Sequence, residues 1–529
     1  MDAIRATDLR PSGGPPDGAR FPLWDRAPAL WLGGWQTVLI AASVVQFLRC
    51  DGAPYLWVVV ATALPLARCC GNPAYRRRLL TGVRRLWASA EAFATEPRRL
   101  PWRAAFLLIV LPAGLFFLTQ THPIMTGDSK PITLTACSLV RDGTSDLTAF
   151  AEHYGVENHF NAPDQLPYFL RHTATGIHSS YHSGMVVFAI PSAALARLLG
   201  ARLNEINAQN HLEKGIASWL AAACLGLFFL LALHVVDART AGLVTLLLAV
   251  GSALCSTVGQ ALWQHGGVVF WMLLFLLVEF RTWRRPTHGC VLLQGVALAM
   301  MFACRLSSGL LVLCLGLWLL WRAPRRAALV GLLGALCYLP WAWYYHSIYG
   351  TPFGPSIAQM LGFALRWRET VLPMLVSPDH GLLVYQPWIL LGLAACLPGL
   401  RRLTPVGEPG DPPAGWRWFC AAAIVLHLTL IASWNCWWGG DCWGSRLATE
   451  TVPLFALLCL RPIAGLLRLA WGRRLLLGML LVAAFPHLTG VYLKANYCDC
   501  QRGLFSQRLE PPGSWQNLPF LTPFVHHGT

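Results

Sequence analysis

The strongest constraint on this chain is a succession of long apolar blocks between residues 28 and 492. Each block holds roughly 14 to 21 residues, and a bilayer core of roughly 30 Å needs about 20 apolar residues per helix. The pattern predicts an all-α polytopic membrane protein with about 13 transmembrane helices. The predicted spans are 28–48, 54–70, 103–120, 215–235, 241–259, 266–280, 289–304, 308–321, 327–345, 381–399, 417–433, 447–460 and 473–492.

The supply of charge excludes a soluble enzyme. Only 12% of the 529 residues are charged, whereas soluble proteins carry about 25%. Lys and Arg together number 41 against 25 for Asp and Glu. The arginines sit at the ends of apolar blocks, which is typical of topology signals, so we expect no nucleic-acid partner. Residues 1–20 contain three arginines and no apolar core, which argues against a cleavable signal peptide.

Arginine placement predicts the orientation in the membrane. With the N-terminus in the cytoplasm, the clusters near 76–85, 281–285 and 322–326 all fall on the cytoplasmic side. The alternation requires that the apolar stretch 184–199 does not cross, so we expect a helix lying on or dipping into the outer face. This orientation suits the cytoplasmic membrane of a cell, with the C-terminal tail outside.

Four segments follow from this topology, and the polar chemistry falls on the outer side. They are a cytoplasmic N-terminal segment 1–27, an N-terminal hairpin with a basic linker 28–102, a core 103–492 that contains an outer loop 121–214, and an outer tail 493–529. Twelve of the 16 histidines lie in the outer segments. No internal repeat is visible, which argues against an inverted-repeat transporter.

Asp128 is the first candidate for chemistry. It follows the third apolar block by about eight residues, where desolvation should raise its pKa and make it a better base. Alternatively, Gly127-Asp128-Ser129 is ordinary turn chemistry. Lys130 lies two residues further on and is a candidate for substrate binding.

The stretch 176–184 supplies the next candidates, Tyr181 and His182. Small polar residues before Gly184 also suit a simple interfacial turn. His178 and His182 are four apart and could share a helix face, as metal ligands often do. No carboxylate lies close in sequence to complete such a site, so we expect no metal.

Two further candidates lie at the ends of apolar blocks. His265 follows Trp263 and Gln264 between two predicted spans, where it could bind a sugar hydroxyl or a phosphate, although Trp at an interface is an ordinary anchor. Arg305 separates two apolar runs. A charge at that depth usually serves a pocket, unless the turn is shallow and the side chain extends to water.

The segment 433–450 is the most informative. It contains Trp437, Trp438, Asp441 and Arg446 among several glycines. Tryptophan faces stack on sugars or cations, glycine lets a ligand approach the backbone, and Arg446 could grip a phosphate. An aromatic belt followed by a loop would explain the tryptophans alone. Cys436 and Cys442 flank the loop, and spacing leaves a disulfide open.

Taken together, these motifs resemble the GT-C superfamily of membrane glycosyltransferases, in particular bacterial members of the protein mannosyltransferase and lipid A aminoarabinose transferase branch. The resemblance covers about 103–460. It is carried by Asp128, by Ser180-Tyr181-His182-Ser183-Gly184, by Leu262-Trp263-Gln264-His265-Gly266, by 381–387, and by Trp437-Trp438-Gly439-Gly440 with Gly444-Ser445-Arg446. Many relatives have paired acidic residues where this chain has Asp128 alone, and a proline where it has Ser445.

The resemblance implies a sugar donor linked to polyprenyl phosphate, a lipid, glycan or protein acceptor at the outer face, and no cofactor or metal. Asp128 would be the base, and Arg446 and Arg305, supported by Lys130 and His265, would stabilise the leaving phosphate. Two alternatives remain open. One is a non-catalytic GT-C-like partner in envelope polysaccharide assembly, and the other is a lipid or glycan transporter.

Overall fold

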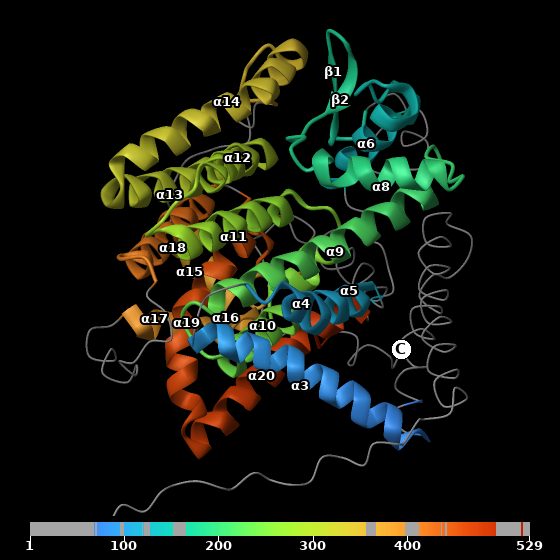
Figure 1. Ribbon diagram of the computed structural model, residues 1–529. Helices are drawn as coiled ribbons and strands as arrows, with labels where there is room; N and C mark the ends of the chain where they lie inside the picture. Colours follow the sequence, from blue (N-terminus) through green and yellow to red (C-terminus); the bar gives the residue numbers. More distant parts are fainter. Residues whose placement is uncertain are drawn as a thin grey trace, which may run out of the picture.

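The described part of the chain is mostly helical and contains one two-stranded sheet (Figure 1). The computed structural model describes residues 68, 71–95, 100–118, 120, 127–151, 166–355, 367–396, 412–434, 436–439, 442–492 and 520–521. The elements are α3 Pro73–Thr95, α4 Trp102–Ala105, η1 Phe106–Val110, α5 Leu111–Leu118, α6 Lys130–Asp142, β1 Leu170–Thr173, β2 Gly176–Ser179, α8 Val186–Leu198, α9 Ile206–Ala232, α10 Ala238–Val250, η2 Leu254–Val258, α11 Gln264–Thr282, α12 His288–Cys304, η3 Leu306–Ser308, α13 Gly309–Arg322, α14 Pro324–Tyr349, η4 Trp367–Val371, α15 Leu372–Val376, α16 Leu382–Tyr385, α17 Ile389–Cys396, α18 Trp416–Ala432, η6 Arg446–Thr451, α19 Val452–Leu467 and α20 Ala470–Tyr492.

Five described helices are long and apolar enough to cross a membrane: α9, α11, α14, the continuous run Arg446–Leu467, and α20. They agree with the expected all-α membrane protein. The total of thirteen spans, the GT-C-like arrangement and the orientation stay predictions. The predicted span 28–48, almost all of 54–70, and most of the tail lie outside the described residues.

Three predicted spans differ from the helices that form. The span 215–235 begins earlier, at Ile206, because the buried charges of Glu213 and Lys214 find partners inside the protein. The span 241–259 is divided between α10 and a π-helical turn, η2, after α10 ends at Val250. The span 381–399 is interrupted before α17, where Pro387 has no backbone N–H to continue a helix.

A fully buried carboxylate joins four helices at one end of the bundle. Glu279 on α11 lies 2.5 Å from Arg322 on α13 and 2.6 Å from Arg326 on α14. The amide of Gln294 on α12 donates to it at 3.0 Å. Figure 1 shows these four helices side by side. Two arginines that the sequence marks as topology signals therefore also neutralise a charge between the helices.

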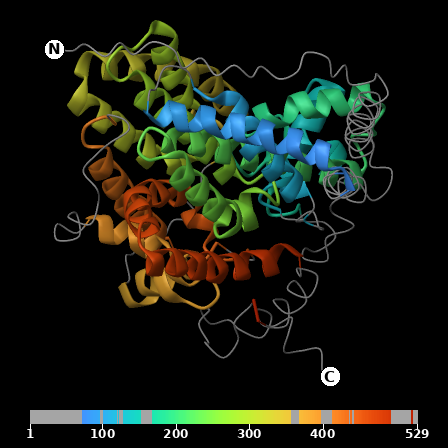
Figure 2. The ribbon, with the colours of Figure 1, turned by 60° about the horizontal axis from the view of Figure 1, so that its bottom comes forward.

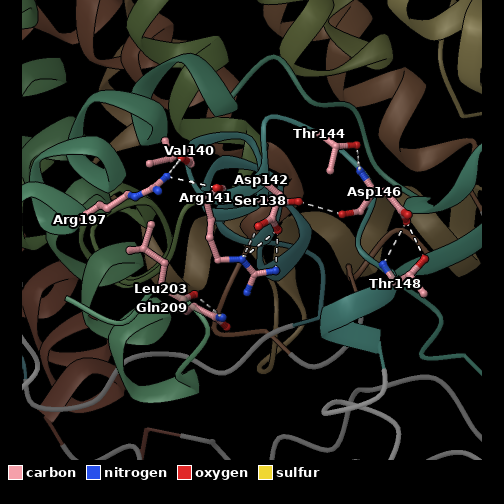
Figure 3. Close-up of polar contacts among 10 residues, drawn as sticks. All are labelled: Ser138, Val140, Arg141, Asp142, Thr144, Asp146, Thr148, Arg197, Leu203 and Gln209. Atoms are coloured by element: carbon pink, nitrogen blue, oxygen red, sulfur yellow. Dashed lines mark hydrogen bonds and ion pairs between the residues drawn. The ribbon is translucent and has the colours of Figure 1, made fainter. Parts of the chain in front are cut away.

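Residues 127–151 and 166–205 form a small segment at the N-terminal end of α9, and we call this segment the cap. It holds α6, the antiparallel hairpin of β1 and β2, and α8. Arg197 on α8 donates to the carbonyls of Val140 and Arg141 at the end of α6, which joins the two helices (Figure 3). The expected helix at 184–199 is therefore present as α8, and its 13 residues span only about 20 Å. That it does not cross stays a prediction.

The cap is fastened to the end of α12 by its backbone. The N–H of Gly184 donates to the carbonyl of Ala303 at 3.0 Å, and a Cβ at position 184 would lie 2.4 Å from the Ala303 carbonyl carbon. Only glycine permits this approach. The Tyr345 hydroxyl completes the joint, because it accepts from the Ser183 N–H at 2.9 Å and donates to Ala303 at 3.1 Å.

The basic linker expected at 71–102 contains a long helix, α3. Its arginine-rich first half is exposed, and its second half packs on the bundle through Trp87, whose ring lies 6.3 Å from that of Phe229 on α9. Figure 2 shows α3 lying across the bundle. The apolar face that ends in Phe93 explains why this charged segment is helical rather than extended.

Candidate functional site

Asp128 lies in the turn immediately before α6, and three side chains among the described residues donate hydrogen bonds to it. Its Oδ1 accepts hydrogen bonds from the hydroxyls of Tyr181, at 2.6 Å, and Tyr168, at 3.0 Å. Its Oδ2 accepts from Nη1 of Arg446 at 2.7 Å. The Asp128 side chain keeps 22% of its surface exposed. This carboxylate is therefore held rigidly and still reached from outside the protein.

The backbone before Asp128 depends on the absence of a side chain. A Cβ at Gly127 would lie 2.4 Å from the Tyr168 hydroxyl oxygen and 2.6 Å from the Phe169 ring. Glycine thus lets the turn approach the tyrosine that bonds the neighbouring carboxylate. The turn interpretation of Gly127-Asp128-Ser129 and the functional interpretation are both compatible with this geometry.

Arg446 begins η6 and is 8% exposed. Besides its bond to Asp128, its Nη2 donates to the carbonyl of Gly439. Its guanidinium carbon lies 4.1 Å from the centre of the Trp263 ring, a cation–π contact. Its Nε has no hydrogen-bond acceptor among the described residues. The guanidinium is thus held from several sides, and the described hydrogen bonds use only one N–H on each of its terminal nitrogens.

The expected rise in the pKa of Asp128 is wrong. Burial alone would raise it, but the positive charge of Arg446 and the bonds from Tyr181, Arg446 and Tyr168 outweigh burial and lower it. Burial and the adjacent carboxylate raise the pKa of Tyr181, so that its hydroxyl remains a hydrogen-bond donor. In the structure described, Asp128 is an ionised group with a counter-charge and a weak base.

A second polar cluster lies about one turn of η6 beyond Arg446. Glu450 is fully buried, and its Oε1 accepts from Nη1 of Arg305 at 2.7 Å. His265 Nδ1 lies 2.8 Å from the same oxygen, and His427 Nε2 lies 3.5 Å from the other. Arg305 is only 12% exposed. Its charge is therefore paired inside the protein, which rules out the alternative that it extends to water.

Two other predicted binding residues point elsewhere. Lys130 is buried against Glu213, with 3.1 Å between Nζ and Oε2. His182 Nε2 lies 2.8 Å from the carbonyl of Phe353, and burial lowers its pKa to about 4, so the neutral ring donates this bond. The prediction that His178 and His182 could share a helix face is also wrong. His178 lies on β2, where it contacts Ser145 and Thr175.

The tryptophan segment is packed rather than open. Trp437 is 4% exposed and belongs to a small apolar cluster that includes Met374 and Ile431, with Trp438 packed against it. The face of Trp437 is thus unavailable for stacking on a sugar. The loop still contributes through Gly439, which holds Arg446. Asp441 lies outside the described residues.

Several groups at the site carry no clear signal in the sequence. Tyr168 stands in no motif, and His427 lies inside an apolar block that predicts only a span. Trp263 was expected as an interface anchor, and its cation–π contact depends on an arginine far along the chain. Glu450 could have been suspected, because a carboxylate at the head of an apolar span usually needs a partner.

Comparison of the chain with protein-family models, with curated proteins and with solved structures gives no match. The function must therefore be argued from the site itself, from its exposed carboxylate, its fixed guanidinium and its place at the ends of apolar helices.

Proposed function

We propose that this chain is a membrane glycosyltransferase, which moves a sugar from a polyprenyl-phosphate donor to a hydroxyl group at the outer face of the cytoplasmic membrane. One observation carries the proposal. A partly exposed carboxylate, Asp128, and a buried guanidinium, Arg446, meet at the end of membrane-length helices. Transfer from a lipid phosphate needs both groups, one to accept a proton and one to stabilise the departing phosphate.

Arg446 is the better of the available cations for the phosphate. Lys130 is neutralised by Glu213, and Arg305 by Glu450. Arg446 faces a carboxylate that is partly open to solvent, and its described hydrogen bonds use only one N–H on each of its terminal nitrogens. A planar guanidinium can grip a phosphate through two nitrogens. The donor phosphate would therefore replace Asp128 as the main partner of Arg446.

That exchange of partners would also prepare the base. While Arg446 pairs with Asp128, the pKa of the carboxyl group is low and its basicity is weak. When Arg446 turns to the phosphate, the carboxylate loses much of its counter-charge while burial remains, and its pKa rises. Donor binding would thus convert Asp128 into a competent base only when a lipid phosphate occupies the site.

The bond changes balance without a cofactor. The acceptor oxygen forms a bond to the anomeric carbon, and its proton passes to Asp128. The bond between the anomeric carbon and the phosphate oxygen breaks, and its electron pair leaves with the polyprenyl phosphate. Arg446 stabilises the added negative charge, and Tyr181 and Tyr168 hold the carboxylate in line. Asp128 then releases its proton to water.

Purified protein in liposomes supplies the test. A polyprenyl-phosphate sugar labelled in the sugar is added with a hydroxyl acceptor, and labelled product and released polyprenyl phosphate are measured. Equal amounts of both are expected. Binding of the donor without release would favour the non-catalytic partner. Movement of intact donor between leaflets would favour a transporter.

A further inference from the structure

The buried carboxylate of Glu213 links the segment that carries Asp128 to the segment that carries Trp263. Glu213 lies on α9 and is 2% exposed. Its Oε1 accepts from the hydroxyl of Ser129 at 2.5 Å and from the backbone N–H of Leu262 at 3.2 Å. Ser129 directly follows Asp128, and Leu262 directly precedes Trp263, the ring against which Arg446 packs. One oxygen atom is thus hydrogen-bonded both to the segment that carries Asp128 and to the segment that carries Trp263.

The other oxygen of Glu213 explains how the charge is tolerated. Lys130 Nζ lies 3.1 Å from Oε2 and also donates to the side chain of Asn210. A buried carboxylate without a counter-charge strongly destabilises the folded state. Lys130 therefore supplies a counter-charge to Glu213 inside the protein, and hydrogen bonds to a paired carboxylate are stronger than those between neutral groups.

We infer that Glu213 is a positioning residue, which sets the distance between Asp128 and Arg446 through Ser129 on one side and Leu262 on the other. The inference rests on the proposed function, because it takes Asp128 and Arg446 as the groups that meet the substrate. Glu213 itself contacts neither of them in the described contacts. Its role is to hold two loops at a common point, so that a shift of either loop moves one reacting group away from the other.

The test separates the hydrogen bonds of Glu213 from its charge. Lys130→Met with Glu213→Gln removes both charges but keeps an acceptor oxygen for Ser129 and Leu262. Lys130→Met with Glu213→Leu is equally neutral and has no acceptor. The leucine variant should melt at the lower temperature, because Ser129 and Leu262 lose their acceptor, so turnover is compared at a temperature at which both variants are folded. Turnover should stay near that of the unmodified protein in the glutamine variant and fall roughly 10–100-fold in the leucine variant, as expected for a small displacement of reacting groups.

Hydrogen exchange gives a second measurement that is independent of activity. The amide of Leu262 should exchange faster in the leucine variant than in the glutamine variant, because its acceptor is missing. Equal turnover in the two variants would overturn the inference. If the unmodified protein transfers no sugar, the proposed function fails by itself. Exchange at Leu262 and in 127–131 then decides the role of Glu213, and equal exchange in the two variants would refute it.

Discussion

Asp128 and Arg446 are 318 positions apart in the chain, and their side chains meet at 2.7 Å. The contact joins the cap to the loop that precedes α19. Both segments therefore lie at the same end of the helices. The contact also makes the carboxylate and the guanidinium a single unit, in which a change to one alters the charge felt by the other.

Replacing Asp128 by Asn should abolish most of the transfer. The amide is nearly the same size but cannot accept the acceptor's proton, and a positioned base typically contributes about 100- to 10,000-fold. The measurement is initial rate in liposomes at saturating donor. Asp142→Asn is the matched control, because that carboxylate is exposed and pairs only with its neighbour Arg141 in the described contacts. Wild-type turnover in Asp128→Asn would remove Asp128 from the mechanism.

A double-mutant cycle should reveal strong coupling between the two groups. Asp128→Asn, Arg446→Gln and the double variant are compared for the free energy of unfolding in detergent. A partly buried ion pair with good geometry should give a coupling of about 1–3 kcal/mol. Additive effects, within measurement error, would show that the 2.7 Å contact contributes nothing to the stability of the fold.

The same pair predicts how stability depends on pH. The pKa of Asp128 is lowered from its ordinary value of 3.8. Its contribution to stability is therefore complete above that value and is lost as pH falls through the lower pKa of the folded protein. Arg446→Gln should raise the pKa of Asp128 in the folded protein, because it removes the neighbouring positive charge. The gap in melting temperature between the two proteins should accordingly be widest near neutral pH and narrow below about pH 4. A gap that stays constant would contradict this cause.

Removing the charge of Glu450 should destabilise the bundle. Glu450→Gln leaves Arg305 buried without its carboxylate, which typically costs about 3–5 kcal/mol. The melting temperature in detergent should fall clearly. Glu205→Gln provides the control, because Glu205 and Arg202 form an exposed pair 3.2 Å apart, and such pairs contribute about 1 kcal/mol or less. Similar melting temperatures for both variants would disprove a structural role for Glu450.

The orientation can be tested by labelling single introduced cysteines. Arg202→Cys in the cap should react with a membrane-impermeant thiol reagent added to intact cells, since position 202 is well exposed. Arg285→Cys, exposed beyond the far end of α11, should react only after the membrane is permeabilised. The unmodified chain supplies the background from its native cysteines. Labelling of both positions from outside would invalidate the topology.

The apolar blocks allowed most described helices to be anticipated, because hydrophobic length is a local property. Breaks were harder to anticipate. The end of α10 and the interruption before α17 depend on single residues within apolar runs. The early start of α9 buries Glu213, whose charge is paired with Lys130. That lysine lies more than 80 positions earlier in the chain.

The site was anticipated through residue types and not through contacts. Asp128, Tyr181 and Arg446 are brought together, whereas Lys130 and Trp437 are buried in other surroundings. By residue type alone, Lys130 and Trp437 suit substrate binding as well as the residues that do meet at the site. Only packing distinguishes a lysine that is available to a substrate from one that is paired with Glu213. The predicted pKa shift of Asp128 was wrong for the same reason, because the direction of the shift depends on the guanidinium of Arg446, which is distant in the sequence.

The backbone joint at Gly184 has a mechanical consequence. Tyr181 precedes this joint by three residues, and Arg305 follows the carbonyl of Ala303 by two. A main-chain hydrogen bond and the Tyr345 hydroxyl join these stretches. The backbone segments that carry Tyr181 and Arg305 are therefore expected to move together. Any route by which a lipid-borne molecule reaches Asp128 must therefore open on another side of the protein, away from this seam.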